Sequence, residues 1–369
     1  ITELKTSDRS GNMENVVAAF SDIMDYERQQ GPYLNAVVAP VAGRIAYGSY
    51  SMENTVHQLS INNAVIICMV VRVDIQTVFH VEEEEQALHF HLECRHDMDG
   101  FPQGTYRYDI WYRLSGNNLI IEYHGTPPQK SLMNMTSHMY FNLSGNLRES
   151  ILQHDLRIDS GKTENHPDGH PFEKEKIGAG SAFDFRNLTP IQKRYELGHP
   201  EFQYTRAYDT PFLLGPNGIT LYHAGSGRRL DMTTDAPSLV LYSANYFDDE
   251  NLVLNHHRRG EAFIALALET QDLPNGVNIR NAKCIHFMMH GIRISRKRYI
   301  PFLICKTGQP SASKFESNRD IVYPSLKYRA DIEQGIGLSL NADAHTGSTG
   351  EEEKRAGNIR MLQQLALSQ

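Results

Sequence analysis

The chain has 369 residues, of which 40% are hydrophobic and 22% charged, and its 44 acidic residues outnumber 36 lysines and arginines to give a formal net charge of −8. This composition is ordinary for a soluble globular protein and lacks the basic excess that is typical of nucleic-acid-binding domains. The longest apolar run, residues 64–71, is far too short to span a bilayer. Nucleic acid and membrane are therefore excluded as expected partners, and a neutral or weakly polar substrate is favoured.

The cysteines and the start of the chain bear on the cellular compartment. No secretory leader is recognisable at the start of the sequence. The sequence begins at Ile1 and not at Met, so it leaves open whether a further N-terminal segment precedes it. Four widely spaced cysteines form no CxxC pair, which is typical of reduced thiols inside the cell: Cys68, Cys94, Cys284 and Cys305. We therefore expect a cytoplasmic protein.

Alternating apolar and polar residues predict β-strands through most of the first 280 residues. A short early helix is predicted within residues 15–30. The predicted strands, separated by turn sequences such as GNN and PNG, cover residues 87–93, 106–114, 117–123, 219–223 and 238–242. Many short strands with few helices predict an all-β fold, a large antiparallel β-sandwich or barrel, and we expect the sandwich.

The character of the chain changes after about residue 278. Residues 290–298 are basic, and TGSTG at 346–350 is typical of a flexible linker, with apolar residues at helical spacing after it. We expect a main domain at residues 1–278, a divergent C-terminal part at 279–345 packed on the same domain, and a linker with a short helix at 346–369.

Two segments carry candidate catalytic side chains. In NMTSHMYFNLSG, residues 134–145, His138 lies where a strand enters a turn, a place that a purely structural histidine also takes. In LETQDLPNGVN, residues 268–278, Glu269 closes an apolar strand before a turn. Partial desolvation there raises the pKa of a carboxylate towards the range of a general base, whereas an exposed strand-end glutamate would carry no function.

Together with residues 22–33, 43–46 (GRIA), 206–214 (RAYDTPFLL) and 242–248 (YSANYFD), these two segments resemble the aldose 1-epimerase (galactose mutarotase) family over about residues 1–278. The resemblance implies a mutarotase-like sandwich with its site on the concave face of one sheet. It implies an isomerase that interconverts the α and β anomers of a free aldohexose such as galactose or glucose.

The resemblance also implies roles for three residues. Glu269 is the base for the anomeric hydroxyl, His138 is the acid for the ring oxygen, and Asp209 is the substrate-binding carboxylate. Their charged atoms should face one another within several ångströms across a solvent-reachable cavity. Neither a metal nor another cofactor is implied, the expected partner is a monosaccharide, and the expected protein is a monomer or homodimer.

The chain departs from the family at several sugar-contacting positions. Tyr47 and Gly48 stand where the family has Asn-Arg, residues 66–71 (IICMVV) lack its second histidine, and Val240 replaces a glutamine. Because each good polar contact contributes about 0.5–3 kcal/mol, these losses predict weak monosaccharide binding. An altered enzyme, a non-catalytic sugar-binding or regulatory protein, or a sequence error in this stretch would each explain them. Another enzyme class on this sandwich, such as a lyase, would need a long cleft lined with aromatics.

A separate cluster, HFHLECRH, has the composition of a metal site: His89, His91, Cys94 and His96. On a strand, however, His89 and His91 share one face while Cys94 and His96 take the other, so the four side chains would not converge. We therefore expect ordinary strand residues and no metal.

Overall fold

The computed structural model describes residues 1–29, 31–52, 54–61, 66–70, 80–84, 87–95, 100–165, 173–249 and 251–279, together with the backbone of four later strands. The linker and helix expected at residues 346–369 lie outside the described residues.

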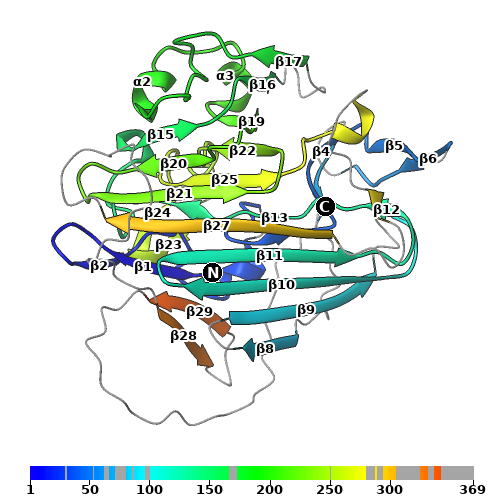
Figure 1. Ribbon diagram of the computed structural model, residues 1–369, viewed down its shortest axis with the longest axis horizontal. Helices are drawn as coiled ribbons and strands as arrows, with labels where there is room; N and C mark the ends of the chain where they lie inside the picture. The colour runs from blue at the N-terminus through cyan, green and yellow to red at the C-terminus, as the bar shows by residue number, and fades with distance from the viewer. Residues whose placement is uncertain are drawn as a thin grey trace.

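A nine-stranded antiparallel sheet forms one layer of the molecule (Figure 1). Its order is β18 (Thr189–Pro190), β15 (Asp155–Ile158), β20 (Ile219–Tyr222), β21 (Arg228–Thr234), β27 (Ile294–Ile304), β11 (Asn118–Thr126), β10 (Thr105–Ser115), β9 (Ala87–Arg95) and β8 (His80–Glu84). Strand β27 pairs with β21 on one side and with β11 on the other. A segment beyond residue 278 thus takes a place in the middle of this sheet.

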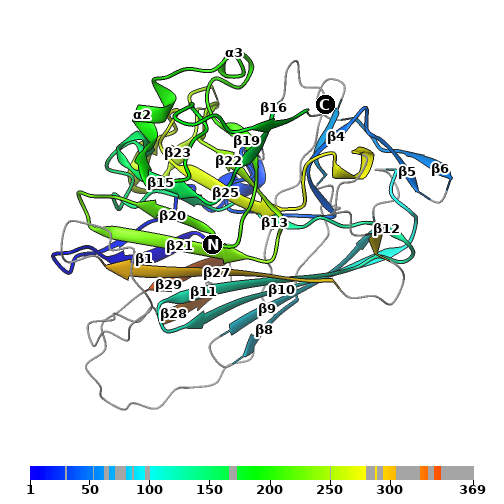
Figure 2. The same cartoon turned by 45° about the horizontal axis from the view of Figure 1, so that its top comes forward.

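A six-stranded antiparallel sheet forms the second layer. Its order is β14 (Tyr140–Phe141), β25 (Leu266–Gln271), β22 (Ser238–Tyr242), β19 (Asp209–Leu213), β16 (Lys162–Asn165) and β17 (Glu173–Lys176). Figure 2 shows it above the nine-stranded sheet. Both sheets contribute to one hydrophobic core, the first through Leu119 and Ile121, the second through Leu239 and Leu268. The all-β sandwich predicted from the sequence is confirmed.

The remaining elements are short. Two-stranded pairs join β3 (Val37–Val38) to β13 (Thr136–Ser137), β4 (Val41–Ala46) to β7 (Ile66–Val70), β5 (Ser49–Met52) to β6 (Thr55–Gln58), β12 (Ser131–Leu132) to β26 (Phe287–Met288) and β23 (Val253–Leu254) to β24 (Arg258–Arg259). A four-stranded sheet has the order β2 (Met13–Asn15), β1 (Glu3–Ser7), β29 (Ile336–Asn341) and β28 (Ser325–Ala330). The helices are α1 (Asp25–Arg28), α2 (Ile191–Tyr195) and α3 (Phe202–Thr205), with 3₁₀ helices η1 (Ile151–Gln153), η3 (Asn255–His257) and η4 (Gly276–Asn278).

Within the part of the chain described, no helix has the length and apolar character needed to cross a membrane.

Strand formation follows the alternation in the sequence. In β11, Leu119, Ile121 and Tyr123 are buried and their neighbours are half-buried, because successive side chains of a strand point to opposite faces. The five strands predicted from this pattern are present as β9, β10, β11, β20 and β22.

The early helix predicted within residues 15–30 is wrong for most of its length, since only α1 is helical. Residues 16–20 are all buried, and Val17 and Phe20 form isolated bridges with Phe141 and Leu254. A surface helix buries one stripe of side chains. A run buried at every position instead suits an extended segment that is covered on both faces.

A pair of buried histidines anchors the segment that follows β14. The Nε2 atom of His154 accepts a hydrogen bond from the N–H of Leu143 (2.9 Å), and its ring lies 4.6 Å from that of His223. Burial above all, and then the charge of His223, hold the pKa of His154 well below its usual 6.5. Burial also lowers the pKa of His223.

The free energy of unfolding is therefore expected to fall as the pH drops below about 6.5. His154 takes up a proton near that pH in the unfolded chain, but only at much lower pH in the folded protein. The unfolded state then binds more protons, and each such histidine lowers the free energy of unfolding by about 1.4 kcal/mol per pH unit. Urea unfolding at several pH values measures this slope. His154→Gln should flatten it, since the amide can accept the same hydrogen bond without titrating, and an unchanged slope would contradict the assignment.

Candidate active site

The fold brings the predicted acid and base into contact. His138 follows β13 directly, Glu269 lies in β25, and Nε2 of His138 is 3.2 Å from Oε1 of Glu269. The hydroxyl of Thr136 donates a hydrogen bond to the carbonyl of Thr270 (2.9 Å), which fastens β13 beside β25. Two side chains far apart in the sequence thus form one imidazole–carboxylate pair.

The immediate surroundings of this pair differ from the expectation. The side chains of His138 and Glu269 are only 4% and 5% exposed, and they touch rather than face each other across a cavity. A cavity of about 40 Å³ is lined by Arg44, Asn134 and Asp272 among others, but not by His138 or Glu269. It has room for a water molecule or two and not for a hexose. Because His138 and Glu269 are in direct contact, a sugar that binds between them must replace that contact with contacts of its own.

Neighbouring rings and backbone fix the position of His138. The Tyr140 ring lies 4.8 Å from the imidazole, and the Tyr242 ring stands edge-on at 6.1 Å. The backbone N–H of His138 donates a hydrogen bond to the carbonyl of Ala36 (2.8 Å), and its carbonyl accepts one from the N–H of Asn35 (3.1 Å). These contacts leave the imidazole little freedom to turn away from Glu269.

Asp209 lies on the same face of the six-stranded sheet as Glu269. It is directly opposite Tyr242 on β22, which is opposite Ala267 on β25. Directly paired residues share a face, as do residues two apart along a strand, so Asp209, Ala267 and Glu269 point the same way. Leu268 points into the core between the sheets, so this face is the one turned away from the core.

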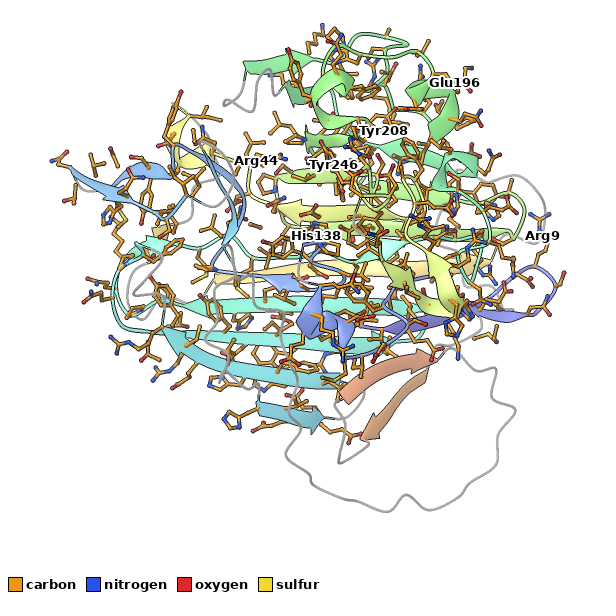
Figure 3. All side chains as sticks on the ribbon, turned by 180° about the vertical axis from the view of Figure 1, so that it is seen from behind. Arg9, Arg44, His138, Glu196, Tyr208 and Tyr246 are labelled. Carbon is orange, nitrogen blue, oxygen red and sulfur yellow. The ribbon has the colours of Figure 1, made fainter. Side chains whose placement is uncertain are left out.

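Arg44, which the sequence reading did not assign to the site, binds Asp209. Its guanidinium reaches from β4 and donates two hydrogen bonds to the carboxylate, at 2.5 and 3.4 Å, with both side chains largely buried. Arg44, Tyr246 and His138 are labelled in Figure 3. One sequence feature could have identified Arg44 as a site residue: it is the single charged residue of the strand VAGRIA, whose other residues are apolar or glycine.

The expectation that the site lacks an arginine is therefore corrected. Tyr47 and Gly48 lie in the turn after β4, where Tyr47 is 56% exposed. Arg44, three positions earlier, supplies the guanidinium. Val240 does leave an apolar side chain directly opposite Glu269. Of residues 66–71, the backbone of the first five forms β7 beside β4, and residue 71 lies outside the described residues.

Tyr246 is a further residue that sequence reasoning missed. Burial, and next the charge of Asp209, raise its pKa, which places its ring near the Arg44–Asp209 pair. Its hydroxyl donates a hydrogen bond to the carbonyl of Tyr204 (3.0 Å), and the guanidinium of Arg206 lies 4.7 Å from its ring centre. The tyrosine is thus held at the edge of the site.

The histidine-rich strand β9 is separate from this site. His89 Nε2 and His91 Nδ1 lie 2.9 and 2.8 Å from the same oxygen of Asp109 on the outer face of the nine-stranded sheet. Cys94 is buried on the opposite face, as the parity of the strand predicts, and His96 lies outside the described residues. In the described part of the chain, no group of three or more His, Cys, Asp or Glu has the geometry of a metal site.

Fold and site together define a class: an all-β sandwich with a buried histidine–glutamate pair and an arginine–aspartate pair at one sheet face. The aldose 1-epimerase family model matches residues 1–287. The chain is 29% identical over 297 residues to a galactose mutarotase from Sus scrofa, with 75% of this chain and 81% of that protein covered. It is 28% identical over 264 residues to an aldose 1-epimerase from Escherichia coli, at 68% and 74% coverage.

The crystal structure of an aldose epimerase homologue from C. elegans superimposes with a TM-score of 0.71 at 19% identity, over 82% of this chain and 92% of that one. This likeness shows the fold. With the family match over most of its length, the chain belongs to the aldose 1-epimerase family.

Proposed function

We propose that this protein is an active aldose 1-epimerase that interconverts the α and β anomers of a free aldohexose such as galactose or glucose. The observation that carries the proposal is the 3.2 Å contact between His138 and Glu269 beside the Arg44–Asp209 pair. An imidazole and a carboxylate at one place can give and take a proton near neutral pH.

Ring opening needs one group of each kind. The carboxylate of Glu269 takes the proton of the anomeric hydroxyl, and the imidazolium of His138 gives a proton to the ring oxygen. The bond between C1 and the ring oxygen breaks, and C1 becomes the aldehyde carbon. This step uses the ionised form of the Glu269 carboxylate and the protonated form of the His138 imidazole, two charges that stabilise each other when the groups are in contact.

Ring closure returns the site to its starting state. The aldehyde rotates about the C1–C2 bond, and the hydroxyl oxygen that came from the ring attacks its other face. His138 takes the proton of that hydroxyl, and Glu269 returns its proton to the new anomeric oxygen. No net proton is gained or lost in the cycle.

Asp209 and Arg44 would hold the sugar. The carboxylate can accept hydrogen bonds from hydroxyl groups, and the guanidinium can donate to them. Because each already binds the other, they are preorganised and need little rearrangement when the sugar enters.

Cytoplasmic localisation, a monomeric or homodimeric state and the domain boundaries of the sequence analysis stay predictions.

Addition of the protein to freshly dissolved α-galactose or α-glucose is expected to speed the change in optical rotation. We expect a KM in the millimolar range, near −4 kcal/mol of binding free energy, because apolar Val240 faces the base. The polarimetric rate at increasing protein concentration measures the effect. Binding of a hexose without acceleration would favour the non-catalytic alternative, and would refute the proposed activity.

A further inference from the structure

Gln271 carries a buried amide for which the described residues provide no hydrogen bond. The residue is 2% exposed, and neither Oε1 nor Nε2 of its side chain has a partner among the described residues. Buried amides are nearly always hydrogen-bonded, so an exception calls for a ligand or an ordered water. Such an amide offers one acceptor and two donor hydrogens.

The position of Gln271 ties this amide to the active site. It is the last residue of β25, two positions after Glu269, and therefore lies on the same face of the sheet. Opposite it on β22 is Ser238, two positions before Val240, which faces Glu269. The amide is thus the next side chain along the strand from the base.

Strand β4 passes over this amide at Gly43, the residue before Arg44. A Cβ atom at Gly43 would lie 3.2 Å from Oε1 of Gln271 and 3.1 Å from Cγ of Pro274, both tight contacts. The φ of Gly43 is +76°, which also disfavours a side chain. The glycine therefore leaves Gln271 room between the base and the strand that carries Arg44.

We infer that the side chain of Gln271 binds a hydroxyl group of the sugar and helps to determine which aldohexose is accepted. This inference rests on the proposed epimerase function. Val240, which lies directly opposite Glu269 on β22, is apolar and cannot supply such a hydrogen bond, whereas the amide next along β25 can. A sugar hydroxyl supplies both a donor and an acceptor, and so can satisfy an amide that has no partner among the described residues.

A buried water is the competing explanation, and the two differ in their kinetics. Gln271→Met removes the amide at similar volume. If the amide binds the sugar, the variant should raise KM for the accepted hexose about tenfold with kcat changed less than about twofold, because a uniform binding contact is lost. Thr270→Val is the matched control, since Thr270 points to the other face of β25 and should keep the wild-type KM.

Deoxy sugars identify the hydroxyl. For the analogue that lacks the contacted hydroxyl, wild type and Gln271→Met should have the same KM, whereas the other deoxy analogues should keep the tenfold difference. An unchanged KM in Gln271→Met for every sugar, with normal turnover by the wild type, would overturn the inference and leave the epimerase function standing.

Sugar binding separates failure of the inference from failure of the proposed function. If the wild type shows no turnover, the epimerase proposal fails, and calorimetric titration with galactose and glucose then tests Gln271 directly. About tenfold weaker binding by Gln271→Met supports the contact. Equal binding by both proteins, or no binding by either, overturns it.

Discussion

Glu269→Gln is expected to abolish the acceleration of mutarotation, with kcat reduced by at least about 10²–10⁴-fold. The amide keeps the size of the side chain and can still contact Nε2 of His138, which lies 3.2 Å from the present carboxylate. It cannot take the proton of the anomeric hydroxyl, so ring opening loses its base. Polarimetry of fresh α-galactose gives kcat, and thermal unfolding followed by circular dichroism shows whether the variant is folded.

Glu201→Gln is the matched control for this change. Glu201 is as deeply buried as Glu269, and its Oε1 accepts a hydrogen bond from Thr210. Thr210 shares a face of β19 with the core residue Phe212, so Glu201 contacts the core face of the sheet and not the face that carries Glu269. The control removes a buried carboxyl group without touching His138 or Glu269, so it should keep the wild-type kcat. Full activity in Glu269→Gln would refute the mechanism.

His138→Asn is expected to slow the reaction by about 10²–10⁴-fold, which is the usual contribution of one positioned acid. Asparagine cannot deliver a proton to the ring oxygen near neutral pH. The loss should fall on kcat, with KM changed only a few-fold, because Arg44 and Asp209 remain to hold the sugar. Polarimetry over a range of sugar concentrations separates the two constants.

His124→Asn provides the comparison, since His124 lies on β11 of the other sheet and pairs with Glu122 there (3.0 Å). It should retain wild-type kinetics. The double variant His138→Asn/Glu269→Gln should be no slower than the slower single variant, because two groups that act in one proton relay are not additive. A kcat in His138→Asn within about threefold of wild type would exclude the imidazole as the acid.

The sequence alone determined the features that depend on near neighbours. The alternation in YRYDIWYRL and NNLIIEY predicts β10 and β11, because the period of two is a local property of a strand. His138 and Glu269 were assigned their roles because NMTSHMYFNLSG and LETQDLPNGVN resemble the aldose 1-epimerase family, whereas each residue in its own segment was also consistent with a structural role. Residues 16–20 show where sequence-based prediction fails. Their apolar character is evident from the sequence, but they are extended because distant segments cover them on both faces.

Only the tertiary structure decided which side chains meet. Arg44 and Asp209 are far apart in the chain, and nothing near either residue indicates the other as its partner. Equally, that neither polar atom of the Gln271 side chain has a hydrogen-bond partner among the described residues depends on Gly43 passing over it and on Ser238 and Val240 lying opposite its strand. These contacts depend on the register of the sheets and on where strands cross, which interactions between distant segments determine. The local pattern of a sequence does not indicate which distant segment will pack against it.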